Sequence, residues 1–327
     1  MKKLTEIVVT IVLISVILLG ISIWKGWWRP LSVSSEWEYK GIVVENEHDY
    51  NQNPDIIQLE NGCYRMYTHG NRKGIEENNI FSFYSCDGMK WEFEGMRIES
   101  AAMPAAIIVN GKTRIYFQRG IEREGKPEQA LMVAESEDGL TFGEPKKLLE
   151  TGLGELKDII TISHFDIVKT ENGYRIYFDE GGKLMKDVPG FEKTGWLWPV
   201  TRVRSLFSVD GFNWTLEEGA RIDYTQGFLK KGGGTASVVK LDDGYHIFFV
   251  AGFSPWEEWE PWSRKEWSGI YEGVSKDGLN FELIDKRIST GTDPKAVRKG
   301  NVLWLYVSRE TENRRGHNLI ELLEKKL

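Results

Sequence analysis

Clusters of basic residues are missing from this sequence of 327 residues, in which 42 Lys and Arg face 49 Asp and Glu. The net charge of −7 and the lack of any Lys/Arg-rich block argue against nucleic acid as a partner. Cysteine is scarce too: Cys63 and Cys86 are the only two, too few for a cysteine metal site. No metal and no cofactor are predicted, although the sequence leaves a Ca²⁺ on the axis of the fold open.

Charge is absent from 18 consecutive positions near the amino end, residues 7–24. This run is just long enough to span a bilayer, for which about 20 residues are typical. A cleaved signal peptide is the alternative, but no small-x-small cleavage site follows, and an aromatic belt with Trp27 and Trp28 does. We therefore expect a single-pass membrane protein whose main domain lies outside the cytoplasm. Its expected parts are a short tail (1–6), a transmembrane signal anchor (7–28), a linker (29–35) and one domain (36–327).

One segment occurs five times in the main domain, and each copy is followed by the same partner segment. The copies start at Trp37, Trp91, Phe142, Trp214 and Phe281, which are 54, 51, 72 and 67 residues apart. The partner segments are an apolar run, a tight turn and a second strand, at residues 55–67, 105–117, 166–177, 237–249 and 295–306. A period of this size is that of a propeller blade.

Each repeat predicts a blade of four strands, a to d from the centre outward. Asn-Gly or Asp-Gly pairs mark the turn between strands a and b, and Ser-x-Asp-Gly marks the turn between strands c and d. The fifth repeat ends without a strand d, whereas residues 37–45 form a strand d with no blade before it. Pairing these two ends closes the ring. We therefore predict an all-β fold, a five-bladed β-propeller closed by an N-terminal strand.

The predicted register of the first blade pairs Thr68 with Phe81, which places Cys63 opposite Cys86. A cross-strand disulfide is then possible and would fit an oxidising compartment. Two separate buried thiols are the alternative.

Equivalent positions at the start of the five inner strands should surround the axis. A first ring comprises Asn53, Met103, His164, Thr235 and Asp293; a second ring, two residues further along each strand, comprises Asp55, Ala105, Asp166, Ser237 and Lys295. Carboxylates that converge on a cavity are what glycoside hydrolysis requires, and His164 could carry a proton beside them. The alternative is that these side chains accept hydrogen bonds from neighbouring backbone amides.

The Asp/Asn-Pro strand starts, the strand at residues 172–177 and the Ser-x-Asp-Gly turns resemble those of the five-bladed propeller glycosidases. This group includes the arabinanase and β-xylosidase family, the invertase and levansucrase families and the mannoside phosphorylases. The resemblance covers about residues 37–327. It implies an Asp base or nucleophile in the first blade, a second-blade Asp that tunes a pKa, and a third-blade acid that donates the proton.

This sequence departs from that pattern, since Asn53 replaces the first-blade Asp and Ala105 leaves the second blade without a carboxylate. We predict that Asp55 is the base or nucleophile and that Asp166 or Glu180 donates the proton. Asn53, His164, Asp293 and Arg204 are predicted to bind substrate. The alternative is a propeller that binds a glycan, or acts as a scaffold, without cleaving it.

Two long connections between strands b and c should overhang the rings, at residues 181–200 and 253–268. They contain Trp196, Trp256 and Trp259, whose indoles could stack on the C–H faces of an oligo- or polysaccharide. Packing of these indoles against the rim, or contact with a partner or membrane, are the alternatives.

Overall fold

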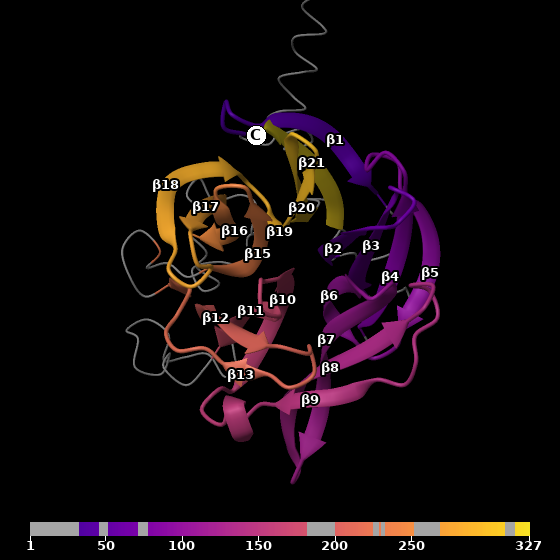
Figure 1. Ribbon diagram of the computed structural model, residues 1–327, viewed down its shortest axis with the longest axis vertical. Helices are drawn as coiled ribbons and strands as arrows, with labels where there is room; N and C mark the ends of the chain where they lie inside the picture. The colour runs from indigo at the N-terminus through magenta and orange to yellow at the C-terminus, as the bar shows by residue number, and fades with distance from the viewer. Residues whose placement is uncertain are drawn as a thin grey trace, which may run out of the picture.

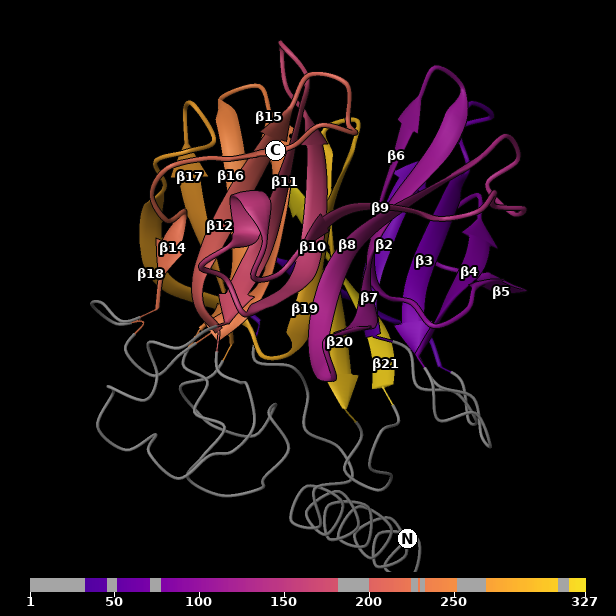
Figure 2. The same cartoon turned by 90° about the horizontal axis from the view of Figure 1, so that it is seen from below.

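The computed structural model describes residues 33–45, 52–70, 78–181, 200–224, 229, 233–251, 269–310 and 318–327. These residues form five antiparallel blades around one axis (Figure 1), as the repeat predicts. The inner strand of each blade borders that axis, and Figure 2 shows the blades from the side.

Blades 1 and 2 have four strands each, in the order of the sequence. Blade 1 consists of β2 (Gln52–Gln58), β3 (Tyr64–Gly70), β4 (Asn79–Ser85) and β5 (Glu92–Ile98). Blade 2 consists of β6 (Ala102–Val109), β7 (Lys112–Arg123), β8 (Lys126–Ser136) and β9 (Lys146–Glu150). A 3-10 turn, η1 (Gly154–Leu156), leads into the next blade.

Blades 3 and 4 are linked by one residue pair, Val200 with Gly233. Blade 3 consists of β10 (Thr161–Lys169), β11 (Tyr174–Gly181) and β12 (Val200–Ser208), with an outer strand split into β13 (Thr215–Leu216) and β14 (Ile222–Asp223). Blade 4 consists of β15 (Gly233–Leu241), β16 (Gly244–Ala251), β17 (Gly269–Ser275) and β18 (Glu282–Ser289).

Blade 5 closes the ring as predicted. It consists of β19 (Thr292–Lys299), β20 (Val302–Glu310), β21 (Asn318–Lys326) and, as its outer strand, β1 (Glu38–Val44) from the amino end. The antiparallel pairing runs from Glu38 opposite Glu324 to Val44 opposite Ile320. The closure leaves neither chain end as an unpaired strand within the ring.

The repeated aromatic residue at the start of each outer strand packs against the preceding blade. It meets an aromatic side chain of that blade's second strand, with ring centroids 5.4–6.2 Å apart, in the pairs Tyr67–Phe142, Tyr116–Trp214, Tyr177–Phe281, Phe248–Trp37 and Tyr306–Trp91. Such pairs contribute about 0.5–1.5 kcal/mol beyond their buried area. The periodicity that identified the blades thus reflects contacts between the blades.

The Ser-x-Asp-Gly turns add hydrogen bonds to the same contacts between blades. In the second blade's turn, Asp138 accepts the backbone N–H groups of Leu140 and Thr141, and Tyr67 of blade 1 donates to the Gly139 carbonyl at 2.8 Å. Arg65 donates to the Asp138 carbonyl at 2.7 Å. Tyr116, Tyr177 and Tyr306 make the equivalent bond to Gly211, Gly278 and Gly88. These turns lie at the opposite end of the strands from the rings and have a structural role.

Cys63 and Cys86 are joined by a disulfide. The register pairs Thr68 with Phe81 and Tyr64 with Ser85, as the sequence indicated, and so brings the two cysteines together across β3 and β4. Of the two alternatives that the sequence left open, the structure has the cross-strand disulfide and not two separate thiols.

The predicted transmembrane anchor, residues 7–28, lies outside the described residues. Within the described part, no helix is long and apolar enough to cross a membrane. The anchor therefore remains a prediction from sequence.

Candidate functional site

A pocket opens on the axis where the five inner strands begin. All five residues of the predicted first ring line it, together with four of the second ring: Asp55, Asp166, Ser237 and Lys295. The cavity among these described residues has a volume of about 20 Å³. That volume holds about one water molecule and is too small for a ligand the size of a sugar ring.

The first ring is built from five β-bulges. Each inner strand skips a pairing at this point, and the bulged residue has a left-handed backbone: φ is 49° at Asn53, 56° at Met103, 48° at His164, 51° at Thr235 and 48° at Asp293. Non-glycine residues in this region cost roughly 1–3 kcal/mol each, and a β-branched residue such as Thr235 is the least suited. Strain repeated in every blade around a pocket indicates a functional constraint.

Hydrogen bonds between neighbouring blades stabilise these bulges. The backbone N–H of His164 donates to the Met103 sulfur at 3.1 Å, and that of Asp293 donates to the Thr235 hydroxyl at 3.3 Å. The Asn53 N–H donates in turn to the Asp293 carboxylate. In each case the first-ring side chain of one blade accepts the N–H of the next.

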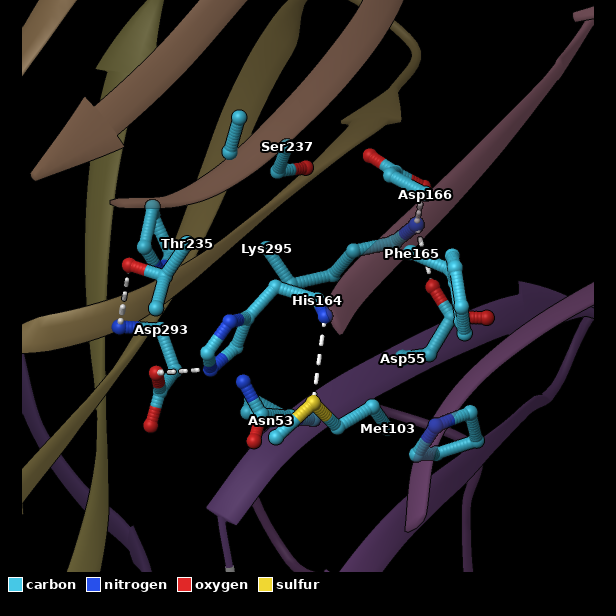
Figure 3. Close-up of a pocket in the computed structure, with 14 residues that line it drawn as sticks. Asn53, Asp55, Met103, His164, Phe165, Asp166, Thr235, Ser237, Asp293 and Lys295 are labelled. Carbon is cyan, nitrogen blue, oxygen red and sulfur yellow. Dashed lines mark hydrogen bonds and ion pairs between the residues drawn. The ribbon is translucent and has the colours of Figure 1, made fainter. Parts of the chain in front are cut away.

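Blade 1 does not follow this pattern, since Oδ1 of Asn53 accepts no hydrogen bond from a described residue, and blade 3 replaces it with another acceptor. The N–H of Thr235 is accepted at 2.6 Å by Oδ2 of Asp179, at the end of β11, instead of by His164. The same oxygen lies 3.0 Å from Nδ1 of His164, which also faces the Ser163 hydroxyl at 3.1 Å. The other imidazole nitrogen, Nε2, lies 4.0 Å from Oδ1 of Asp293 (Figure 3).

The second ring lies deeper and holds a buried cation. Lys295 extends across the axis between Asp55 and Asp166 (Figure 3), with its ammonium paired to Asp55 and 2.7 Å from Oδ1 of Asp166. Both carboxylates are 2% exposed. Buried charges are tolerated only when paired, and here one ammonium serves two carboxylates.

The second-ring side chains also accept backbone hydrogen bonds from the next blade. Asp55 accepts the N–H of Ala106, Asp166 accepts that of Val238 at 2.6 Å, and Ser237 accepts that of Ala296 at 3.1 Å. The alternative that the sequence left open, in which these side chains bind neighbouring amides, is thus realised in the second ring.

The electrostatics of the two rings differ. Burial raises the pKa of Asp55, and the nearby Asp166 adds to this while Lys295 opposes it. Burial also raises the pKa of Asp293, against the opposing charge of His164. Burial lowers the pKa of His164, but its hydrogen bond to Asp179 and the charges of Asp179 and Asp293 outweigh this, so the pKa is raised overall. The first ring therefore contains a histidine that favours its protonated form.

Several predicted site residues lie elsewhere. Glu180 is ion-paired with Arg204 at 3.1 Å, and neither lines the axial pocket. Glu180 follows Asp179 in β11, so their side chains point to opposite faces of the blade. Trp196, Trp256 and Trp259 lie outside the described residues. The segments that carry them leave the described chain at Gly181 and Ala251, on the same face as the rings.

The sequence prediction missed the role of one site residue and the presence of another. Lys295 was placed in the second ring, but its pairing with two acids was not foreseen, and Asp179 was not selected at all. Asp179 lies two residues after Tyr177, which faces blade 4, so strand alternation could have directed it towards Thr235. No group of three or more metal-binding side chains occurs in the described residues.

Comparison with known proteins identifies similar structures at low sequence identity. No protein-family description matches the sequence, and no curated protein matches it significantly. Among solved structures, a glycoside hydrolase superposes with a TM-score of 0.67 at 14% identity, over 90% of this chain and 93% of its own. The fold is that of glycoside hydrolases.

Two further structures agree. A thermostable family-43 glycoside hydrolase matches with a TM-score of 0.63 at 15% identity, over 86% of this chain and 91% of its own. A family-117 glycoside hydrolase from Zobellia galactanivorans matches with a TM-score of 0.62 at 13% identity, over 91% and 92%. The predicted resemblance to propeller glycosidases is confirmed at the level of fold. At these identities it does not assign a reaction.

Proposed function

We propose that this protein is a carbohydrate-active propeller, a glycoside hydrolase whose reactive groups are His164 and Asp293. The observation that carries the proposal is the approach of His164 Nε2 to within 4.0 Å of Asp293 Oδ1 at the mouth of the axial pocket. A proton donor and a carboxylate side by side are the two groups that cleavage of a glycosidic bond requires. The fold shared with glycoside hydrolases supports the substrate class.

The depth of the two rings favours His164 and Asp293 over Asp55 and Asp166. Asp55 and Asp166 lie two residues deeper along their strands, and Lys295 neutralises both. Both line a cavity of about 20 Å³, which is too small to admit a sugar ring. We therefore propose that Asp55 and Asp166 stabilise the fold through their ion pairs with Lys295, in place of the base and acid roles that the sequence predicted for them.

The proposed reaction uses water and no cofactor. The His164 imidazolium donates its Nε2 proton to the glycosidic oxygen as the bond from that oxygen to the anomeric carbon breaks. A carboxylate oxygen of Asp293 attacks the anomeric carbon and forms a glycosyl ester. Neutral His164 then accepts a proton from water, whose hydroxyl displaces Asp293 and releases the sugar.

A glycan-binding propeller without turnover is the second candidate, and a specific observation favours it. Blade 2 contributes only Met103 and Ala105 to the rings, so it supplies no carboxylate that could shift the pKa of a catalytic group. In addition, Asp55 and Asp166 in the second ring are both ion-paired with Lys295. In this case a glycan would bind on the first ring without being cleaved.

Product release from a panel of aryl glycosides and oligosaccharides, with and without phosphate, separates the two candidates. Full-length wild-type protein is compared with His164→Gln, Asp293→Asn and Asp55→Asn, and with Asp242→Asn as a control, since Asp242 is exposed, pairs with Arg298 and lies outside the axial pocket. The proposal expects turnover in wild type and the control, and loss of about 10²–10⁴-fold in the His164 and Asp293 variants. A glycan-dependent thermal shift without product in any sample would support the binding protein instead.

We also propose that residues 7–28 anchor the propeller to a membrane on its far side from the rings. The uncharged run at residues 7–24 supports an anchor. β1, the first described strand, begins opposite Glu324 at the end of β21, on the face away from the first ring. The first ring would then point away from the bilayer towards a soluble glycan.

A further inference from the structure

We infer that Asp179 is a positioning residue that holds the His164 imidazole with Nε2 directed at the substrate. This inference deepens the proposed function and rests on it for its catalytic consequence, but its structural content is testable without turnover.

The first argument is geometric. Asp179 is fully buried, and one of its oxygens, Oδ2, meets both His164 Nδ1 at 3.0 Å and the Thr235 N–H at 2.6 Å. The Thr235 bond fixes the carboxylate to the next blade, and the fixed carboxylate in turn fixes the ring of His164. With Nδ1 committed to Asp179, Nε2 is the nitrogen that faces Asp293 and the pocket mouth.

The second argument comes from the broken repeat. At three other junctions the first-ring side chain itself accepts the N–H of the next blade, as Met103 does for His164. In blade 3 the acceptor is Asp179, which binds the N–H of Thr235, so the imidazole of His164 does not accept this bond. Asp179 therefore accepts the interblade hydrogen bond, and the imidazole of His164 is left available for chemistry.

The third argument concerns charge. An uncharged amide or hydroxyl would suffice to accept the Thr235 N–H, as Thr235 does for Asp293. A buried carboxylate is costly unless a cation meets it, and the described residues supply no hydrogen-bond donor to its second oxygen, Oδ1. A protonated His164 is the cation that compensates for the charge of Asp179.

The surroundings of His164 contain other titratable groups that any pH experiment must include. Asp293 faces it from β19, and buried His69 approaches from β3, with a pKa lowered to about 3 by burial and by the charge of His164. Lys295, also on β19, directs its ammonium away to Asp55 and Asp166. His69 is therefore neutral throughout the neutral range, and Asp179 and Asp293 dominate the titration of His164.

The test is imidazole nitrogen NMR of the full-length protein, whose five histidines are few enough to assign with a His164→Gln variant. In wild type we expect His164 to titrate above an ordinary histidine and, when neutral, to retain its proton on Nδ1. In Asp179→Asn we expect titration at lower pH and loss of the single tautomer. A neutral wild-type His164 protonated on Nε2 would overturn the inference, and this holds even if Asp179→Asn does not fold.

Glu272→Gln is the matched control. Glu272 lies 2.7 Å from Nδ1 of His246, the same carboxylate–histidine pair in blade 4, outside the axial pocket. This variant should move the titration of His246 and leave that of His164 unchanged. An equal shift of His164 in Glu272→Gln would mean that the effect is not local, and would also overturn the inference.

Turnover provides the catalytic readout. Because His164 must be protonated to donate, activity should fall as pH rises through its pKa, and Asp179→Asn should move this limb to lower pH. We expect kcat to fall on the order of 10²-fold with KM little changed. Normal NMR behaviour with no turnover in any sample would count against the proposed hydrolase alone, whereas an unmoved pH limb in an active Asp179→Asn would count against the inference alone.

Discussion

The ammonium of Lys295 forms an ion pair with the carboxylate of Asp55 across the axis of the propeller, joining the last blade to the first. Asp166 of blade 3 completes the arrangement at 2.7 Å. Three blades therefore meet at one charge cluster on the axis. Like the pairing of β1 with β21, this cluster connects parts of the chain that are distant in sequence.

Removal of the ammonium should destabilise the fold in a pH-dependent way. Lys295→Met leaves Asp55 and Asp166 buried without a cation, which costs about 3–5 kcal/mol when one partner of a buried pair is removed. Burial already raises the pKa of Asp55, and loss of Lys295 raises it further. The folded state of the variant then binds more protons than the unfolded state between the two pKa values, so its stability falls as pH rises through that window.

Chemical denaturation at about pH 4 and pH 7 measures this effect. We expect the loss in Lys295→Met to be larger at neutral pH than in acid. The double variant Lys295→Met with Asp55→Asn should recover part of the loss at neutral pH, because it buries one charge fewer. An equal loss at both pH values would show that the ammonium acts through packing alone.

The fold was predictable because its repeat is local. Each blade carries its own turn signals and its own aromatic residue at the outer strand, and the unmatched ends at Trp37 and in blade 5 required closure. The ring positions followed from counting along equivalent strands. These inferences needed no knowledge of which side chains meet across the axis.

The roles within the site were less predictable because they depend on contacts between blades. The prediction of Asp55 as a base treated it as an isolated acid, and the ammonium that neutralises it comes from the far end of the chain. Glu180 was selected over its neighbour Asp179, which lies 3.0 Å from Nδ1 of the pocket histidine. Carboxylates cannot be ranked by sequence when burial and partners set their chemistry.

A glycine of the interblade turns should be irreplaceable for two separate reasons. Gly211 has φ of +77°, and an added Cβ would collide with the Arg114 guanidinium and lie 2.6 Å from the Tyr116 hydroxyl. Gly62 has a similar φ of +82°, but a Cβ added there would have no neighbouring atom within 4 Å. Gly62→Ala should therefore cost only the backbone term of about 1–2 kcal/mol.

Gly211→Ala should cost that amount plus roughly 1–3 kcal/mol for overpacking. Thermal or urea unfolding of the two variants side by side checks the difference. Equal losses would mean that the junction between blades 2 and 3 opens without cost, contrary to the packing of the turn against Tyr116.

The disulfide should stabilise the first blade measurably. Cys63 and Cys86 are separated by 23 residues, and closing a loop of that size contributes about 3 kcal/mol in the chain-entropy description. Reduction should lower the unfolding midpoint of wild type, while the double variant Cys63→Ser with Cys86→Ser should unfold at the lower midpoint with or without reductant. A midpoint in wild type that does not respond to complete reduction would contradict the expectation.

The spacing of His164 and Asp293 predicts the stereochemistry of the proposed reaction. Retaining enzymes place their two acidic groups about 5–5.5 Å apart, and inverting enzymes about 6.5–9.5 Å apart, with room for a water. His164 Nε2 and Asp293 Oδ1 are 4.0 Å apart, closer to the retaining spacing than to the inverting spacing, which leaves room for a water. We therefore expect the first-formed sugar to keep the anomeric configuration of the substrate, as proton NMR of the early product would show. Inversion would contradict attack by Asp293 and would require a carboxylate further from His164 that activates water.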